Sequence, residues 1–352
     1  LAGAIGLACG ILVMSRFQAG AIEEMVAVQF GFAQRDDFTV AFVEPTSWHA
    51  VDELAALPGV EVVEPFRASG VILRVGHREY RTSLLGLPGD SDLKRVLDRE
   101  LQPARLPADG LLLTDHLAGM LGVEVGGLVE VEFREGRRER IDVPLAGTVR
   151  EYMGVGAYMR RERMNAMLGE GDVVSGAWLG IDRDLRLQVL DALRERPRVV
   201  AITDSMATVT GFRETMAKGM LTFTLVATLL AGSIAVGVVY NAARITLAER
   251  SHELASLRVL GYTRGEVRRL LGGELFTLAF LALLPGFALG LGMTALLVWG
   301  FESDLYRIPL VMAPSGYAWA GLLVLAATAV SVALVRRRLD RIDLASALKT
   351  KE

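Results

Sequence analysis

Residues 240–274 read YNAARITLAERSHELASLRVLGYTRGEVRRLLGGE, a charged segment between two long apolar runs. Leu247, Ser251 and Leu254 recur at helical spacing on one face, and the alkyl part of Arg258 continues that face. The opposite face carries polar and charged side chains, namely Glu249, His252, Glu253 and Ser256. This pattern is typical of an amphipathic surface helix.

A break and a second helix are expected after this amphipathic helix. Gly261 is placed to end it, as glycine does at many helix C-termini. Thr263 and Glu266 have the spacing of a capping box, so a second helix is expected to start at Thr263 and to run into the next apolar segment. The alternative interpretation is an ordinary solvated loop between two membrane helices.

The composition indicates a membrane protein that also has a charged soluble part. The 352 residues are 52% hydrophobic and yet include 41 acidic and 38 basic side chains, which indicates apolar spans alternating with soluble segments. A net charge of -3 and the absence of a broad basic field give no support to nucleic-acid binding.

Three uncharged runs are long enough to cross a bilayer as helices: residues 219–243, 275–301 and 308–335. The third opens with Pro309 and Pro314, so its helix is expected to start near Tyr317. A further uncharged run, residues 1–15, is shorter than the roughly 20 residues that a span needs. We therefore expect a truncated first span that continues outward as an amphipathic stalk, in a chain that is a fragment.

Small residues in the apolar runs indicate close helix packing. Gly6 and Gly10 have GxxxG spacing, and so do Gly286 and Gly290, which follow a kink expected at Pro285. The single cysteine, Cys9, lies in the first run and is expected to be a packing residue with no disulfide partner in the chain.

Residues 36–205 have the pattern of a soluble α+β domain. Strands are expected at 38–45, 60–66, 70–75 and 79–87, with a helix that Ser47 caps and that ends at Leu57. A β-rich insert is expected at about 106–152, including two strands between Arg137 and Tyr152. Further elements are expected where the chain returns to the first layer: helices at 160–168 and 185–194, and strands at 175–181 and 199–202.

The positive charges of the short loops predict the orientation in the membrane. Six arginines lie between Arg244 and Glu274 and six basic residues lie in the tail 336–352, against one in residues 302–307. The positive-inside rule places the first two segments in the cytoplasm, so the soluble domain is extracytoplasmic. The expected parts are a first helix and stalk (1–35), the soluble domain (36–205), a stalk and second span (206–243), a cytoplasmic segment (244–274), a third span (275–301), an external loop (302–316), a fourth span (317–335) and a cytoplasmic tail (336–352).

The sequence contains no recognisable catalytic or cofactor motif. No GxxxxGK[ST] string is present, so ATP would have to be bound by another subunit. His252 and Glu253 begin an HExxH-like string, but its last position is Ser256. His49, His77 and His116 are scattered without metal-ligand spacing. We therefore expect neither enzymatic activity nor a bound metal or cofactor.

Three segments resemble one protein family. VVYNAARITLAERSHELASLRVLGYTRGEVRRLLGGEL (238–275) closely resembles the loop after the second helix of the FtsX-like, or MacB-type, permease module of bacterial ABC transporters. LGVEVGGLVEV (121–131) looks like the β-rich insert of that family's extracytoplasmic domain, and RIDLASALKTKE (341–352) resembles its cytoplasmic end. The resemblance implies a four-span α-helical membrane protein with an inserted α+β domain of MacB periplasmic type, here the C-terminal module of a long, two-module permease.

The resemblance also implies partners and a role. In this family the segment after the second helix docks onto an ATPase subunit, which binds the ATP, and hydrolysis moves the extracytoplasmic domain by mechanotransmission. Carried over to this chain, the docking residues are Glu249, Arg250, Glu253, Leu254, Leu257, Arg258, Arg264 and Glu266, with Gly261 setting the angle of re-entry. Expected partners are the lipid bilayer of the bacterial inner membrane, a second permease module or second copy, and a periplasmic protein.

Two other roles remain open at this stage. The chain could regulate an extracellular cell-wall hydrolase without transporting anything, or it could be a peptide-sensing subunit that signals to a kinase. For a transporter, the resemblance implies export or extraction of a lipid, lipoprotein or peptide.

Overall fold

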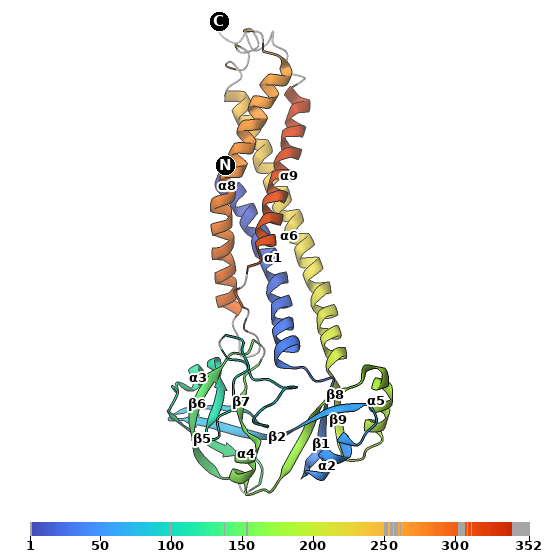
Figure 1. Cartoon of the computed structure of the whole chain (residues 1–352). Helices are drawn as coiled ribbons and strands as arrows, with labels where there is room; N and C mark the ends of the chain where they lie inside the picture. Colours follow the sequence, from blue (N-terminus) through green and yellow to red (C-terminus); the bar gives the residue numbers. More distant parts are fainter. Residues whose placement is uncertain are drawn as a thin grey trace. The chain divides into compact units, whose positions relative to one another are not determined.

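A computed structural model describes residues 2–98, 100–136, 138–152, 154–249, 253, 256, 260, 262–301, 307, 309–310 and 312–339. The chain divides into two compact units. The membrane unit comprises Leu1–Glu23, Met216–Phe301 and Pro309–Glu352, and the soluble unit comprises Glu24–Thr215 and Glu302–Ile308. Figure 1 labels the elements of both.

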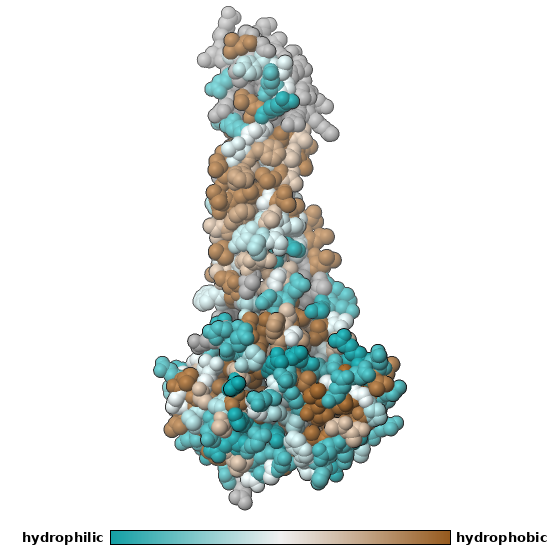
Figure 2. Space-filling model, viewed as in Figure 1, coloured by the Kyte–Doolittle hydropathy of each residue, from teal (hydrophilic) through white to brown (hydrophobic). Residues whose placement is uncertain are grey.

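Four helices in the described part of the chain are long and apolar enough to cross a membrane. They are α1 (Ala2–Ala27), which continues as the π-helical turn η1 (Val28–Ala33), α6 (Ser205–Glu249), α8 (Arg264–Phe301) and α9 (Pro314–Leu339). Figure 2 shows mostly apolar side chains over the helices and mostly hydrophilic ones over the soluble unit. The expected class, four membrane helices with an α+β domain, is confirmed.

The first helix continues past the uncharged run of residues 1–15 and through Arg16, as expected for a stalk, and the candidate span within it covers Gly3–Ala33. The helix α9 starts at Pro314 and not near Tyr317, because proline at the first helical position needs no N–H partner. Pro285 lies inside α8, which is helical from Arg264 to Phe301.

The soluble unit contains nine strands among its described residues (Figure 1). They are β1 (Phe38–Ser47), β2 (Val60–Val75), β3 (Arg78–Leu87), β4 (Leu111–Thr114), β5 (Leu128–Phe133), β6 (Arg140–Val149), β7 (Ala157–Arg160), β8 (Val173–Ile181) and β9 (Val199–Asp204). The helical elements are α2 (His49–Ala55), α3 (Asp115–Leu121), α4 (Arg161–Leu168), η2 (Arg183–Leu185) and α5 (Arg186–Arg194).

The strands form a flat layer and a barrel that share β2. The layer is antiparallel, in the order β2-β8-β1-β9. The barrel closes because β2 pairs with β3 on one side and β5 on the other, and β7, β4 and β6 complete the ring. Residues 60–66 of β2 pair within the layer, whereas residues 67–75 pair within the barrel.

Each part has its own apolar core. Helices α2 and α5 pack on the layer around Phe38, Val40 and Leu54. The barrel interior holds a second core that includes Leu73, Val131 and Leu145, joined by side chains of α3 and α4.

Four expectations about the soluble unit were wrong. Residues 60–66 and 70–75 form the single strand β2 and not two strands. Ser47 belongs to β1, and the first residue before α2 is Trp48, which makes no side-chain capping bond. The described residues between Arg137 and Tyr152 contain one strand, β6, instead of two, while β7 was not expected. The β-rich part therefore includes the β2–β3 hairpin and β7 as well as the expected insert.

Candidate coupling segment and helix roots

The start of α8 is a complete capping box. Thr263 donates its backbone N–H and its hydroxyl to Glu266 Oε2 at 2.8 and 2.9 Å, and the Glu266 N–H donates to Thr263 Oγ1 at 3.3 Å. These hydrogen bonds from Thr263, first from its N–H, lower the pKa of the Glu266 carboxyl. The capping box expected from the sequence is confirmed, and it fixes the direction in which the chain leaves the coupling segment, residues 244–274.

The described residues of the coupling segment from Arg244 to Leu270 whose burial is known are exposed. Glu249 is the last residue of α6, and Glu253 and Glu266 also lie at the surface. Two large apolar side chains are exposed beside them, Leu260 at 77% and Tyr262 at 51%. The other residues with an implied docking role, Arg250, Leu254, Leu257, Arg258 and Gly261, lie outside the described residues, as does the side chain of Arg264. Their role stays a prediction.

The two GxxxG motifs of the sequence pack against each other. A Cβ atom built on Gly290 would lie 2.8 Å from the Val13 Cβ and 3.2 Å from the Gly10 Cα. One built on Gly286 would lie 2.8 Å from the Cβ of Cys9. Only glycine allows backbones to approach so closely, so α1 and α8 form a tight contact that we call the glycine contact. Cys9 is a packing residue within it.

The helix α6 joins the same membrane core through small side chains. Ala231, Ala235 and Val239 are buried in a cluster with residues of α1, α8 and α9. Ser331 of α9 donates its hydroxyl to the backbone carbonyl of Val236 at 3.0 Å. The described helices of the membrane unit thus share one core.

Helices α1 and α6 join the soluble unit at neighbouring strand ends. Phe38, at the start of β1, pairs with Asp204 at the end of β9, and α6 begins at the next residue, Ser205. Asp36, which follows α1 and η1, accepts from the Ser205 hydroxyl at 3.0 Å, and the Ser205 N–H donates to the Asp37 carbonyl at 3.1 Å. Asp36 and Ser205 are buried, so we call this cluster the helix root.

Arg186 binds the helix root from α5. Its guanidinium pairs with Asp204, lies 4.0 Å from Asp37 and stacks 4.7 Å from the centre of the Phe38 ring. Asp204 also accepts from the Ala207 N–H at 2.7 Å and so caps α6. Burial by itself would raise the pKa of Asp204, but the hydrogen bonds from Ala207 and Arg186 lower it overall.

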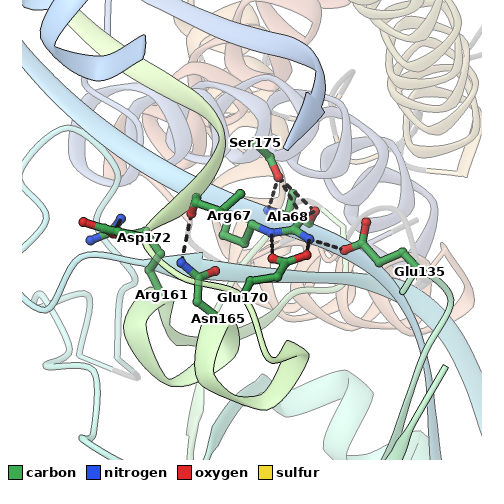
Figure 3. Close-up of polar contacts among 9 residues, drawn as sticks. Arg67, Ala68, Glu135, Arg161, Asn165, Glu170, Asp172 and Ser175 are labelled. Atoms are coloured by element: carbon green, nitrogen blue, oxygen red, sulfur yellow. Dashed lines mark hydrogen bonds and ion pairs between the residues drawn. The ribbon is translucent and has the colours of Figure 1, made fainter. Parts of the chain in front are cut away.

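A second polar cluster lies where β2 passes from the layer into the barrel. Figure 3 shows Arg67 surrounded by its partners. Its fully buried guanidinium binds both carboxylate oxygens of Glu170, at 3.0 and 3.1 Å, and one of Glu135, at 2.7 Å. It also donates to Ser175 Oγ at 2.9 Å and to the Ala68 carbonyl at 2.7 Å. Because Glu135 follows the barrel strand β5 and Ser175 lies in β8, Arg67 fastens the barrel to the layer.

Residues 225–344 match a family model described as FtsX-like permease C-terminal. This part of the chain is an FtsX-like permease domain. The domain contains most of α6, the coupling segment, α8 and α9.

Two solved structures are each similar to about half of the chain. The periplasmic region of MacB from Actinobacillus actinomycetemcomitans is 14% identical, with a TM-score of 0.38, over 52% of this chain and 95% of its own. The extracellular domain of the noncanonic ABC-type transporter YknZ from Gram-positive bacteria is 14% identical, with a TM-score of 0.35, over 47% of this chain and 99% of its own. No curated protein matches the sequence significantly.

Neither the helix root nor the Arg67 cluster was predicted from the sequence, and both lie outside the permease domain. The available signal for Arg67 was an arginine near the centre of a strand sequence, VEVVEPFRASGVILRV, in which Arg74 is a second one. Among the described residues, no three His, Cys, Asp or Glu side chains gather closely enough to hold a metal ion.

Proposed function

We propose that this chain is the membrane subunit of an ABC-type transporter, in which a separate ATPase binds the coupling segment and moves the soluble unit. The observation that carries the proposal is the continuity of α6. This helix runs for 45 residues from the helix root to the coupling segment. At 1.5 Å per residue it is about 67 Å long, with a backbone hydrogen-bonded throughout. A displacement at its cytoplasmic end therefore reaches the root.

A second route runs through α8 and α1. The capping box sets the start of α8 within the coupling segment, and the glycine contact fastens α8 to α1. The chain leaving α1 then enters the helix root at Asp36 and Asp37. Both routes end at the paired strands β1 and β9, so opposite displacements of α1 and α6 would tilt the layer.

The distribution of basic residues supports an assignment of each part to one side of the membrane. The arginine-rich coupling segment faces the cytoplasm, the soluble unit lies outside the membrane, and ATP is bound by the partner. The apolar composition of the four described spans does not favour a charged substrate, whereas an extracytoplasmic domain that changes shape can extract or expel an amphiphile. We therefore propose a lipid, lipoprotein or peptide as cargo, handled in a bacterial inner membrane by a pair of permease modules.

The test is substitution of Leu257, a residue for which the family resemblance implies contact with the ATPase. In a complex reconstituted with the partner ATPase, Leu257→Asp should reduce stimulated ATP hydrolysis by about tenfold, as a charge at the centre of an apolar contact does. Membrane insertion should not change. The matched control is Leu187→Asp, at a position that is 74% exposed in α5. Equal hydrolysis in the Leu257 variant and the unaltered complex would exclude this docking surface.

A further inference from the structure

The connection between α8 and α9 belongs to the soluble unit, although membrane helices flank it on both sides. Residues Glu302–Ile308 group with Glu24–Thr215. One residue of this connection, Arg307, makes three hydrogen bonds to the loop between β6 and β7. Its N–H donates to the Tyr152 carbonyl at 2.9 Å, its Nε donates to the Glu151 carbonyl at 2.9 Å, and its Nη2 donates to the Gly154 carbonyl.

The receiving loop, which we call the carbonyl collar (Glu151, Tyr152 and Gly154), is itself held in place. The Glu151 carboxylate accepts from the buried hydroxyl of Tyr158, and burial followed by the charge of Glu151 raises the pKa of Tyr158 well above its ordinary value. Tyr158 therefore stays a hydrogen donor at physiological pH. Gly154 has a φ of +74°, a backbone conformation that residues with a side chain rarely adopt. Glycine at this position therefore suits the loop whose carbonyl accepts from Arg307.

The collar also contacts the end of the first membrane helix. Tyr152 packs in a small apolar cluster whose buried members are Val28, Ala33 and Leu97. Val28 and Ala33 are the first and last residues of η1, the turn that ends α1. The same loop thus binds the chain after α1 and the chain between α8 and α9.

The chemistry of the collar selects arginine. Three carbonyl oxygens of the collar accept hydrogen bonds from one residue. That residue must supply its backbone N–H and two side-chain N–H groups that point in different directions. A guanidinium presents its donors in a rigid planar fork, whereas the lysine ammonium is a single point at the end of a flexible stem. Arg307→Lys would keep the charge and lose this geometry.

We propose that Arg307 anchors the α8–α9 connection to the carbonyl collar, which gives the soluble unit a third attachment to the membrane helices besides the roots of α1 and α6. If the transport proposal above is correct, tilting of the layer and barrel also pulls on the outer ends of α8 and α9. Arg307 then acts as a positioning residue for the return movement, and α8 receives force at both of its ends.

The anchor can be tested without nucleotide by disulfide trapping. Residues joined by a backbone hydrogen bond have Cα atoms about 5–6 Å apart, which suits a disulfide. A Cys9→Ala background removes the chain's only cysteine. In that background, Tyr152→Cys with Arg307→Cys should join under mild oxidation of membrane vesicles, and mass spectrometry should find the linked peptides. The control pair, Leu187→Cys with Arg307→Cys, should not join. Because Arg307→Cys also removes the guanidinium, this assay tests the backbone contact between residues 152 and 307. Two thiols that both react with a maleimide and yet never join would contradict that contact.

A second measurement isolates the guanidinium. In nanodiscs, hydrogen exchange at the amide of residue 307 should be at least tenfold faster in Arg307→Ala than in the unaltered chain, with Arg307→Lys close to the alanine variant. Arg105→Ala, at an exposed arginine, is the matched control. Unchanged exchange in Arg307→Ala contradicts the proposal. Neither assay involves the ATPase, so a failed anchor and a failed coupling mechanism give different results.

Discussion

At the scale of single residues, the connection between sheet and membrane helix depends on Arg186 and Asp204. Arg186 lies between Asp204 and Asp37 and covers the Phe38 ring. Asp204 uses the same carboxylate oxygen, Oδ1, to cap α6 through the Ala207 N–H. One carboxylate therefore links α5, β9 and the first turn of α6, so its charge contributes to the stability of the root.

The pH dependence of this contribution follows from the lowered pKa of Asp204. A carboxyl whose pKa is lower in the folded than in the unfolded chain stabilises the fold above its unfolded pKa of about 3.9. The stabilisation is lost as the pH falls through the folded pKa. Asp204→Asn keeps a capping oxygen but removes the charge, so it should lower the melting temperature by about 2–4 °C at pH 7.

The difference in melting temperature between Asp204→Asn and the unaltered chain should shrink as the pH falls below about 4. The aspartate of the unaltered chain then becomes protonated and loses its charge. Thermal unfolding of the purified full chain in detergent, followed from pH 7 to pH 3, measures this. Asp191→Asn, at an exposed carboxylate that pairs with Arg194 one helical turn away, serves as the control. A constant difference across the whole range would show that the charge of Asp204 does not stabilise the root.

Residue contacts were predictable from the sequence where they are local. Thr263 and Glu266 lie within one helical turn, so their spacing alone indicated the capping box. Asp36 and Ser205 are 169 residues apart, and Arg67 and Glu170 are 103 apart. No local rule relates such pairs, because their contact depends on the order of strands in the sheet.

At the scale of elements, the close approach of α1 and α8 at the glycine contact can be tested with matched glycines of α8. A methyl group at Gly290 would lie 2.8 Å from Val13, whereas one at Gly292 would meet nothing within 4 Å. Gly290→Ala should therefore force α1 and α8 apart and destabilise the membrane unit by about 1–3 kcal/mol, the usual effect of overpacking. Gly292→Ala should leave the stability unchanged or slightly raised, since alanine favours helix.

Denaturant unfolding in the same detergent compares the stabilities of the Gly290→Ala and Gly292→Ala variants. Because the glycine contact also lies on the proposed route from α8 to α1, Gly290→Ala should lower stimulated ATP hydrolysis in the reconstituted complex, and Gly292→Ala should not. Two variants of equal stability would mean that α1 and α8 are not in contact at these glycines.

Membrane helices were predictable because length and apolar composition suffice to recognise them. The glycine motifs were predictable too, but which motif packs on which was not. Strands were less predictable where local signals misled. Two strands were expected at 60–66 and 70–75, but they form the one long strand β2, which changes neighbours after residue 66. The four residues of β7 were too few to show a pattern, and so closure of the barrel was not foreseen.

At the scale of the whole molecule, the proposed movement requires one orientation in the membrane. The chain passes between the membrane unit and the soluble unit at four points, near the end of α1, near the start of α6, after α8 and before α9. The coupling segment lies at the other end of α6 and at the start of α8. Helices that each cross the bilayer once put these two sets of ends on opposite sides, and the arginine excess decides which side is cytoplasmic.

This orientation can be tested by labelling cysteines that replace exposed glutamates. In the Cys9→Ala background, Glu253→Cys in the coupling segment should react with a membrane-impermeant maleimide only after the cells are opened. This is expected because the proposed orientation puts the coupling segment on the cytoplasmic side of the membrane. Glu124→Cys, exposed on the barrel, should react in intact spheroplasts. The two sites control for each other, since both replace an exposed carboxylate. Labelling of Glu253→Cys from outside would put the coupling segment beyond the reach of any cytoplasmic ATPase and would leave both proposed routes of movement without a source.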